Sequence, residues 1–218
     1  MSTDTITEVD QSGLANPELA GFEVHGLTRS SFILRGALAA GAFYGASAVT
    51  PFVSAALAET GGGDAEILNF ALTLEYLESD FYNVKGKSLN LTGEAKSYAM
   101  MFGEEEADHV TALTAAIKQL GGTPVAKPTF VFPVTSQSTF LTLASVLENT
   151  GVGAYNGAAP SLQSKQVLAA AGSIVQIEAR HAAAIDLLIG KSPTPNEGFD
   201  TPLTKTQVLA KAGPLIKK

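Results

Sequence analysis

Two stretches, LEYLESDFYN at residues 74–83 and LENTGVGAYN at residues 147–156, share the same spacing of Leu-Glu, Tyr and Asn. Each precedes a Glu-x-x-His motif, EADH at residues 106–109 and EARH at residues 178–181. The glutamates that open the two stretches are 73 residues apart, and the two motifs are 72 residues apart. The sequence therefore contains one unit twice, and each unit predicts a pair of helices.

Helix periodicity and end signals predict four helices, and the whole chain is expected to be all-α. They are expected over residues 64–83, from about 92 to the glycines at 121–122, over 136–156 and over 163–190. Asp64 is expected to cap the first helix, and Gly151 and Gly153 weaken the third. The connection at residues 123–135 contains three prolines and could hold at most a short edge strand at 129–132. One long crossover between tight hairpins predicts a four-helix bundle.

The acids and imidazoles of the repeat fall on helix faces that are otherwise apolar. In the fourth helix, Glu178 and His181 lie between Ile174 and Ile185 at spacings of four, three and four, which place all four residues on one face. A carboxylate buried on such a face needs a counter-charge. Four carboxylates and two neutral imidazoles in one core would balance two divalent cations. The pattern predicts a dinuclear metal site with the ligands Glu75, Glu106, His109, Glu148, Glu178 and His181.

The type of ligand favours two iron ions, or manganese, as the cofactor. Oxygen donors with one imidazole per ion suit these metals better than zinc, which prefers more nitrogen or sulfur, or calcium, which prefers oxygen alone. The chain contains no cysteine, so thiolate sites and disulfides are excluded. Its net charge of −7 argues against a nucleic-acid partner.

Several features of the repeat leave more than one interpretation open. A single Glu-x-x-His is a weak motif, and Glu105 also lies near the correct face, but the second copy offers only Glu178 and so selects Glu106. Tyr82 and Tyr155 could support the ligands by hydrogen bonds or simply fill the core. Glu78 is expected to be a partly exposed acid. The whole set could also belong to a bundle that no longer binds metal.

These residues resemble the ferritin-like di-iron carboxylate superfamily. The segments LNFALTLEYLESDFY, EADHVTAL, LENTGVGAYNGAAP and IEARHAAAIDLL are similar to bacterial ferritin-like domain proteins, a group related to desiccation-related proteins. The resemblance implies a ferritin-like bundle at about residues 64–190. It further implies that Glu106 and Glu178 bridge the two metals, that Glu75 and Glu148 are terminal ligands, and that His109 and His181 each bind one metal.

The function expected from this site is redox chemistry with dioxygen or peroxide, as ferroxidase or peroxide detoxification. The alternative is a non-catalytic stress, desiccation-related or envelope protein in which the metal site is stabilising or vestigial. The reaction, the electron donor and the oligomeric state, including a homo-oligomer, stay open at this point.

Residues 1–58 are predicted to be a leader, followed by the bundle at 59–190 and a Pro-containing tail at 191–218. Residues 36–58 carry no charge and end in Ala-Leu-Ala, the pattern expected before a signal-peptidase site. The preceding TRSSFILR at residues 28–35 resembles a twin-arginine export signal in which Ser30 replaces the second arginine. This predicts a periplasmic or exported protein. The alternative is a cytoplasmic protein with an uncleaved N-terminal helix that contacts the bundle, a partner subunit or a membrane.

Overall fold

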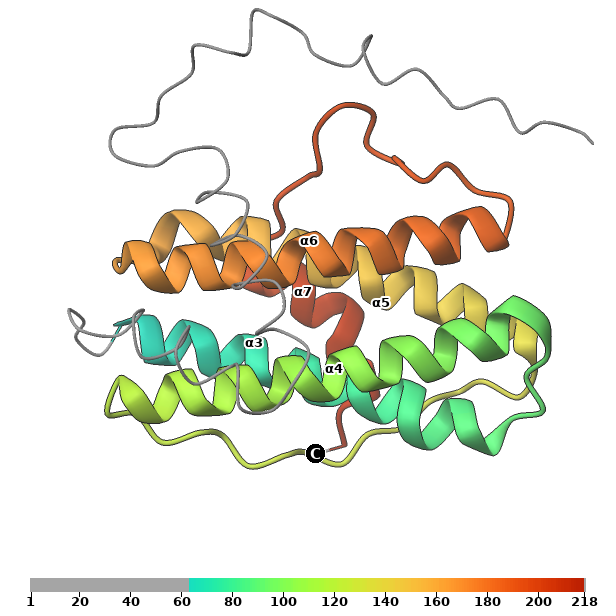
Figure 1. Cartoon of the computed structure of the whole chain (residues 1–218), viewed down its shortest axis with the longest axis horizontal. Coiled ribbons are helices and arrows are strands. Elements are labelled where there is room, and N and C mark those ends of the chain that lie inside the picture. The colour runs from blue at the N-terminus through green and yellow to red at the C-terminus, as the bar shows by residue number, and fades with distance from the viewer. Residues whose placement is uncertain (1–62, 218) are drawn as a thin grey trace, which may run out of the picture. The chain divides into compact units, whose positions relative to one another are not determined.

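The computed structural model describes residues 63–217, and over this range the chain is mostly helical. Four long helices form a bundle (Figure 1): α3 (Gly63–Asp80), α4 (Gly93–Gln119), α5 (Gln137–Ala158) and α6 (Lys165–Leu188). A shorter helix, α7 (Lys205–Ala212), packs against α5. Within residues 63–217 there is no β-sheet, only an isolated antiparallel bridge between Phe130 and Ile216. The all-α four-helix bundle is confirmed, and the leader predicted for residues 1–58 lies outside the described residues.

The connections between helices divide the bundle into two hairpins. A π-helical turn, η3 (Phe81–Lys85), and a 3₁₀ turn, η4 (Gly86–Ser88), join α3 to α4, while a 3₁₀ turn, η5 (Ala159–Ser161), lies between α5 and α6. The connection between α4 and α5 runs back along the bundle, so that α5 begins near the end at which α4 begins (Figure 1). The crossover expected between the second and third helices is therefore present, with two antiparallel hairpins on either side of it.

Local sequence signals explain where the helices of the second hairpin begin and end. Ser136 and Thr139 form a reciprocal capping box at the start of α5. The Ser164 hydroxyl accepts a hydrogen bond from the Val167 N–H and caps α6. Gly190, with φ of 75°, follows the end of α6 in the left-handed conformation that glycine adopts most easily.

Asp64 does not cap the first helix as predicted, because α3 already includes it in its first turn. Its buried carboxylate instead accepts hydrogen bonds of 2.9 Å from the backbone N–H groups of Gln163 and Ser164. These two residues directly precede α6, so that the start of α3 is tied to the start of α6. The correction follows from tertiary contact: a carboxylate at this position reaches the N-terminus of another helix rather than its own.

Two apolar clusters fill the bundle and leave a polar layer between them. One cluster surrounds Phe81, Phe102 and Phe140, and the other surrounds Leu72 and Ile117. Along each long helix the residues of one cluster precede the repeat's glutamate and those of the other cluster follow it. The six predicted ligands therefore lie in the middle of the bundle, with apolar side chains above and below.

The C-terminal segment crosses α5 and closes against it. Gly153 and Gly157 lie four residues apart on α5, and the Leu203 N–H donates a 2.8 Å hydrogen bond to the Gly153 carbonyl. The tail also forms the short helix α7, whose Val208 and Ala212 are buried. The two glycines on α5 make room for the crossing chain, which packs closely against the helix at Leu203.

None of the helices within residues 63–217 is long and apolar enough to cross a membrane. The membrane contact considered for the N-terminal segment concerns residues outside this range.

Candidate metal centre

The six predicted ligands converge from four helices. Glu75 comes from α3, Glu106 and His109 from α4, Glu148 from α5, and Glu178 and His181 from α6. All four glutamates are 0% exposed, and both histidines are buried. The spacing of three in each Glu-x-x-His motif places the carboxylate and the imidazole on one face of the helix. The repeat therefore delivers two matched sets of donors to one point in the core.

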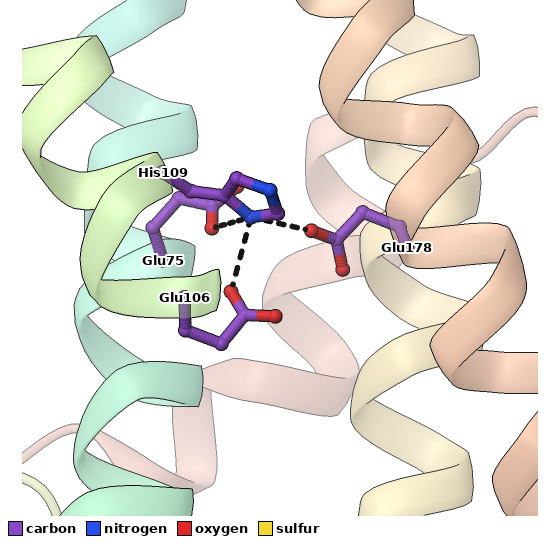
Figure 2. A group of neighbouring side chains, drawn as sticks. All are labelled: Glu75, Glu106, His109 and Glu178. Carbon is purple, nitrogen blue, oxygen red and sulfur yellow. Dashed lines mark hydrogen bonds and ion pairs between the residues drawn. The ribbon is translucent and has the colours of Figure 1, made fainter. Parts of the chain in front are cut away.

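The first set of donors surrounds the Nδ1 atom of His109 (Figure 2). This nitrogen lies 3.2 Å from Glu75 Oε2, 3.4 Å from Glu106 Oε2 and 3.0 Å from Glu178 Oε1. A nitrogen can carry only one proton, so it cannot donate a good hydrogen bond to all three oxygens. Three carboxylate oxygens and one nitrogen around a common point form an arrangement that a metal ion can satisfy.

The second set of donors surrounds His181. Its Nδ1 atom lies 3.1 Å from Glu106 Oε1 and 3.4 Å from Glu148 Oε2. The atoms that Glu106, Glu148, Glu178 and His181 offer all lie within 4.8 Å of one another, as do those of the first set. Glu106 and Glu178 belong to both sets. Glu106 directs one oxygen towards each histidine, which is the arrangement of a carboxylate placed between two cations.

Six buried polar atoms of this cluster have no hydrogen-bond partner among the described residues. Some of these atoms lie near an imidazole nitrogen, but the angles at the two atoms do not fit a hydrogen bond. Unpaired buried carboxylate oxygens are costly, and a cation is the usual way to satisfy them. The donor atoms therefore fit metal ions, and the unpaired atoms are Glu106 Oε1 and Oε2, Glu148 Oε2, Glu178 Oε1 and Oε2, and His181 Nδ1.

The pKa values of the cluster show how strongly it attracts positive charge. Burial raises the pKa of Glu75 from 4.5 to about 7, although the positive charge of His109 opposes the shift. Burial on its own would lower the pKa of His181, but the neighbouring carboxylates, first of all the hydrogen-bonded Glu105, raise it to about 12. Burial would also raise the pKa of Glu106, but both histidines hold it below its usual range. The imidazoles thus supply the only positive charge that the described residues bring to the four carboxylates.

The two repeat tyrosines each bond to a ligand of the opposite hairpin. The Tyr82 hydroxyl donates to Glu148 Oε1, and the Tyr155 hydroxyl donates to Glu75 Oε1. Burial and the adjacent carboxylate raise the pKa of both hydroxyls well above 10, so they remain donors at neutral pH. The structure therefore places both tyrosines next to the cluster, where they orient the two glutamates that belong to only one set.

A contact of His181 with Glu105 is not expected from the sequence. The Nε2 atom of His181 lies 2.7 Å from Glu105 Oε2, on the side of the ring opposite Nδ1. The ring of Phe102 stacks on the imidazole at a centroid distance of 3.9 Å. Both contacts fix the ring so that Nδ1 faces the carboxylates. The sequence places Glu105 near the correct face of α4, but its contact crosses to α6, and no spacing within one helix reveals it.

The prediction that Glu78 is partly exposed is wrong. Glu78 is 2% exposed, and it lies on α3 one turn beyond Glu75. Burial raises its pKa well above the usual range, and the negative charge of Glu178 raises it further. The spacing of three from Glu75 was the available signal, because it places both carboxyl groups on the same face of the helix.

This geometry defines a class: a four-helix bundle of two matched hairpins with a buried carboxylate–histidine cluster able to bind metal. A family model described as the ferritin-like domain matches residues 63–191, which is more than half of the chain, and the chain belongs to this family. A search of curated proteins gave no match. The family membership confirms the resemblance seen in the sequence and agrees with the fold, but it does not specify the metal or the reaction.

Proposed function

We propose that the bundle holds two metal ions, iron or manganese, and uses them for redox chemistry with dioxygen or peroxide. The observation that carries this proposal is that two groups of buried donors share Glu106 and Glu178. Each group offers three carboxylate oxygens and one imidazole nitrogen. Such oxygen-rich sets with a single nitrogen suit iron and manganese. The four carboxylates balance the charge of two divalent ions.

The residues of the chain have distinct roles in this proposal. Glu106 and Glu178 would bridge the two ions, while Glu75 and His109 would complete one position and Glu148 and His181 the other. When bound, iron or manganese would supply the electrons that reduce dioxygen or peroxide. The two apolar clusters on either side limit the access of water to the polar layer.

Metal content is the first test of this site. We expect the wild-type protein, loaded with Mn²⁺ or anaerobically with Fe²⁺, to hold two ions per chain, one for each group of donors. Glu106→Ala and His181→Ala should each lower this content, because the first removes a shared ligand and the second the only nitrogen of one group. Elemental analysis after gel filtration gives the stoichiometry.

Glu104→Ala is the matched control, because Glu104 is an exposed acid on α4 only two residues from Glu106. It should retain both ions. Circular dichroism of each variant establishes that the bundle is folded. Full metal retention by folded Glu106→Ala and His181→Ala would reject the assigned ligands.

Oxidation of the iron-loaded protein distinguishes the enzyme from the non-catalytic alternative. An oxidoreductase should consume dioxygen or peroxide over many cycles when Fe²⁺ or another reductant is supplied in excess. A single oxidation equivalent to the bound iron, with no further turnover, would instead favour a stress or envelope protein in which the metal stabilises the bundle.

A further inference from the structure

One buried carboxyl group beside the cluster is outside the two sets of donors. Glu78 is buried on α3, and among residues 63–217 it has neither a hydrogen bond nor an ion pair. Negative charges on Glu178, Glu106, Glu148 and Glu75 all act on it. A carboxyl group in this position costs stability that an apolar side chain of similar size would not. Packing alone therefore does not account for it.

The internal repeat shows how the molecule accommodates this group. The offset of 73 residues that relates Glu75 to Glu148 relates Glu78 to Gly151. A Cβ atom on Gly151 would lie 3.4 Å from Glu78 Oε1 and 3.3 Å from Glu178 Oε2. Gly151 does not have a positive φ, so its backbone does not require glycine. At this position of the repeat the first hairpin has the carboxyl group of Glu78. The second hairpin has Gly151, whose missing side chain leaves space for that carboxyl group.

The space at Gly151 also places Glu78 beside one particular ligand. The carboxylates of Glu78 and Glu178 both border the point where a Gly151 side chain would begin. Glu178 belongs to both groups of donors. Glu78 therefore lies beside the cluster near a shared glutamate, and its position makes the two otherwise matched halves of the site unequal.

We propose that Glu78 is a seventh ligand of the metal centre, and its fifth carboxylate, held beside Glu178 by the space at Gly151. This inference rests on the metal site proposed above. Four carboxylates balance two divalent ions, and a trivalent pair carries two further positive charges. A fifth carboxylate supplies negative charge for that state, so Glu78 should favour trivalent over divalent ions.

Terbium(III) tests this proposal without redox chemistry, because its luminescence lifetimes in H₂O and D₂O count the water molecules on the bound ion. We expect Glu78→Gln to weaken Tb³⁺ binding about tenfold and to add about one bound water, since a lost ligand is replaced by solvent. The affinity for Mn²⁺ should change less than the affinity for Tb³⁺. Glu66→Gln is the matched control, because it makes the same change of charge at an exposed position of α3.

A second variant, on α5, also tests the position of Glu78. Gly151→Ala places a methyl group against both Glu78 and Glu178, so the change in metal affinity that it causes has a part from each of the two glutamates. In a double-mutant cycle, the loss of Tb³⁺ affinity caused by Gly151→Ala should be smaller when residue 78 is already glutamine. Removing a buried charge should not unfold the bundle, and thermal unfolding of each metal-free variant verifies this.

The outcomes separate this inference from the function on which it rests. Wild-type protein that binds neither Mn²⁺ nor Tb³⁺ would overturn the metal site as a whole. Wild-type protein that binds both ions, with the same Tb³⁺ affinity and water count in Glu78→Gln as in Glu66→Gln, would overturn only the role of Glu78. A more stable Glu78→Gln variant with unchanged metal binding would likewise reject it.

Discussion

The two ring nitrogens of His181 contact different carboxylates. Nδ1 faces Glu106 and Glu148 inside the cluster, and Nε2 bonds to the half-buried Glu105 on the outer side. A carboxylate behind a ligating imidazole fixes its orientation and raises its basicity. In the other half of the site the repeat offset places Ile177 where Glu105 would be. His109 therefore has no equivalent support from that position, and the two metal positions should differ.

Glu105→Ala should weaken one of two metal-binding steps about tenfold and leave the other nearly unchanged, because only His181 loses its supporting carboxylate. Glu105→Gln retains an acceptor oxygen and should recover part of the loss. Calorimetric titration with Mn²⁺ resolves the two steps. Equal weakening of both steps, or no difference between Glu105→Ala and the exposed control Glu104→Ala, would contradict this role.

Among the helices, α5 has two structural roles, and each role requires different residues. It carries Glu148 towards the core, and on another face its glycines admit the C-terminal segment. A Cβ atom on Gly157 would overlap the backbone carbonyl of Leu203. Backbone atoms of a crossing chain cannot move as easily as the end of a flexible side chain. The glycines that lower the helix propensity of α5 therefore permit the contact that covers it.

Gly157→Ala should lower the free energy of unfolding by about 1–3 kcal/mol, since overpacking outweighs the gain in helix propensity. Gly172→Ala is the matched control, because this glycine lies in the middle of α6 with no atom near its Cβ position. The control should stabilise the protein by up to about 1 kcal/mol. Chemical denaturation measures both changes. A stabilised Gly157→Ala variant would show that the tail does not need this glycine.

The helices and the six donors could be predicted because their signals are local. Spacings of three and four residues set the inward face of each helix, and the second copy of the unit selected Glu106 among three adjacent glutamates. Contacts between different helices could not be predicted in this way. The burial of Glu78 depends on a glycine of α5, and the contact of Glu105 depends on a histidine of α6. Likewise, Asp64 reaches the start of α6 instead of capping its own helix.

At the scale of the whole molecule, the buried cluster should make the stability of the metal-free protein depend on pH. The pKa of Glu75 is raised from 4.5 to about 7 on folding. The contribution of Glu75 to the free energy of unfolding is therefore fully present below pH 4.5 and is lost as the pH rises through 7. The pKa of His181 is raised from 6.5 to about 12, so its contribution also decreases above pH 6.5. The lowered pKa of Glu106 has the opposite effect, but only below pH 4.5.

The metal-free protein should consequently lose stability between pH 5.5 and pH 8, with Glu75 alone contributing on the order of 2 kcal/mol over this range. Metal binding should reverse this trend. The ions require ionised carboxylates and neutral imidazoles, so binding releases protons and strengthens as the pH rises. Thermal unfolding with and without Mn²⁺ should show a larger stabilisation by metal at pH 8 than at pH 5.5. Glu75→Gln removes one of the titrating groups and should make the pH dependence of the metal-free protein weaker, whereas Glu66→Gln should not. A metal-free protein whose stability stays constant or rises over this range would show that the four carboxylates are not held together as described.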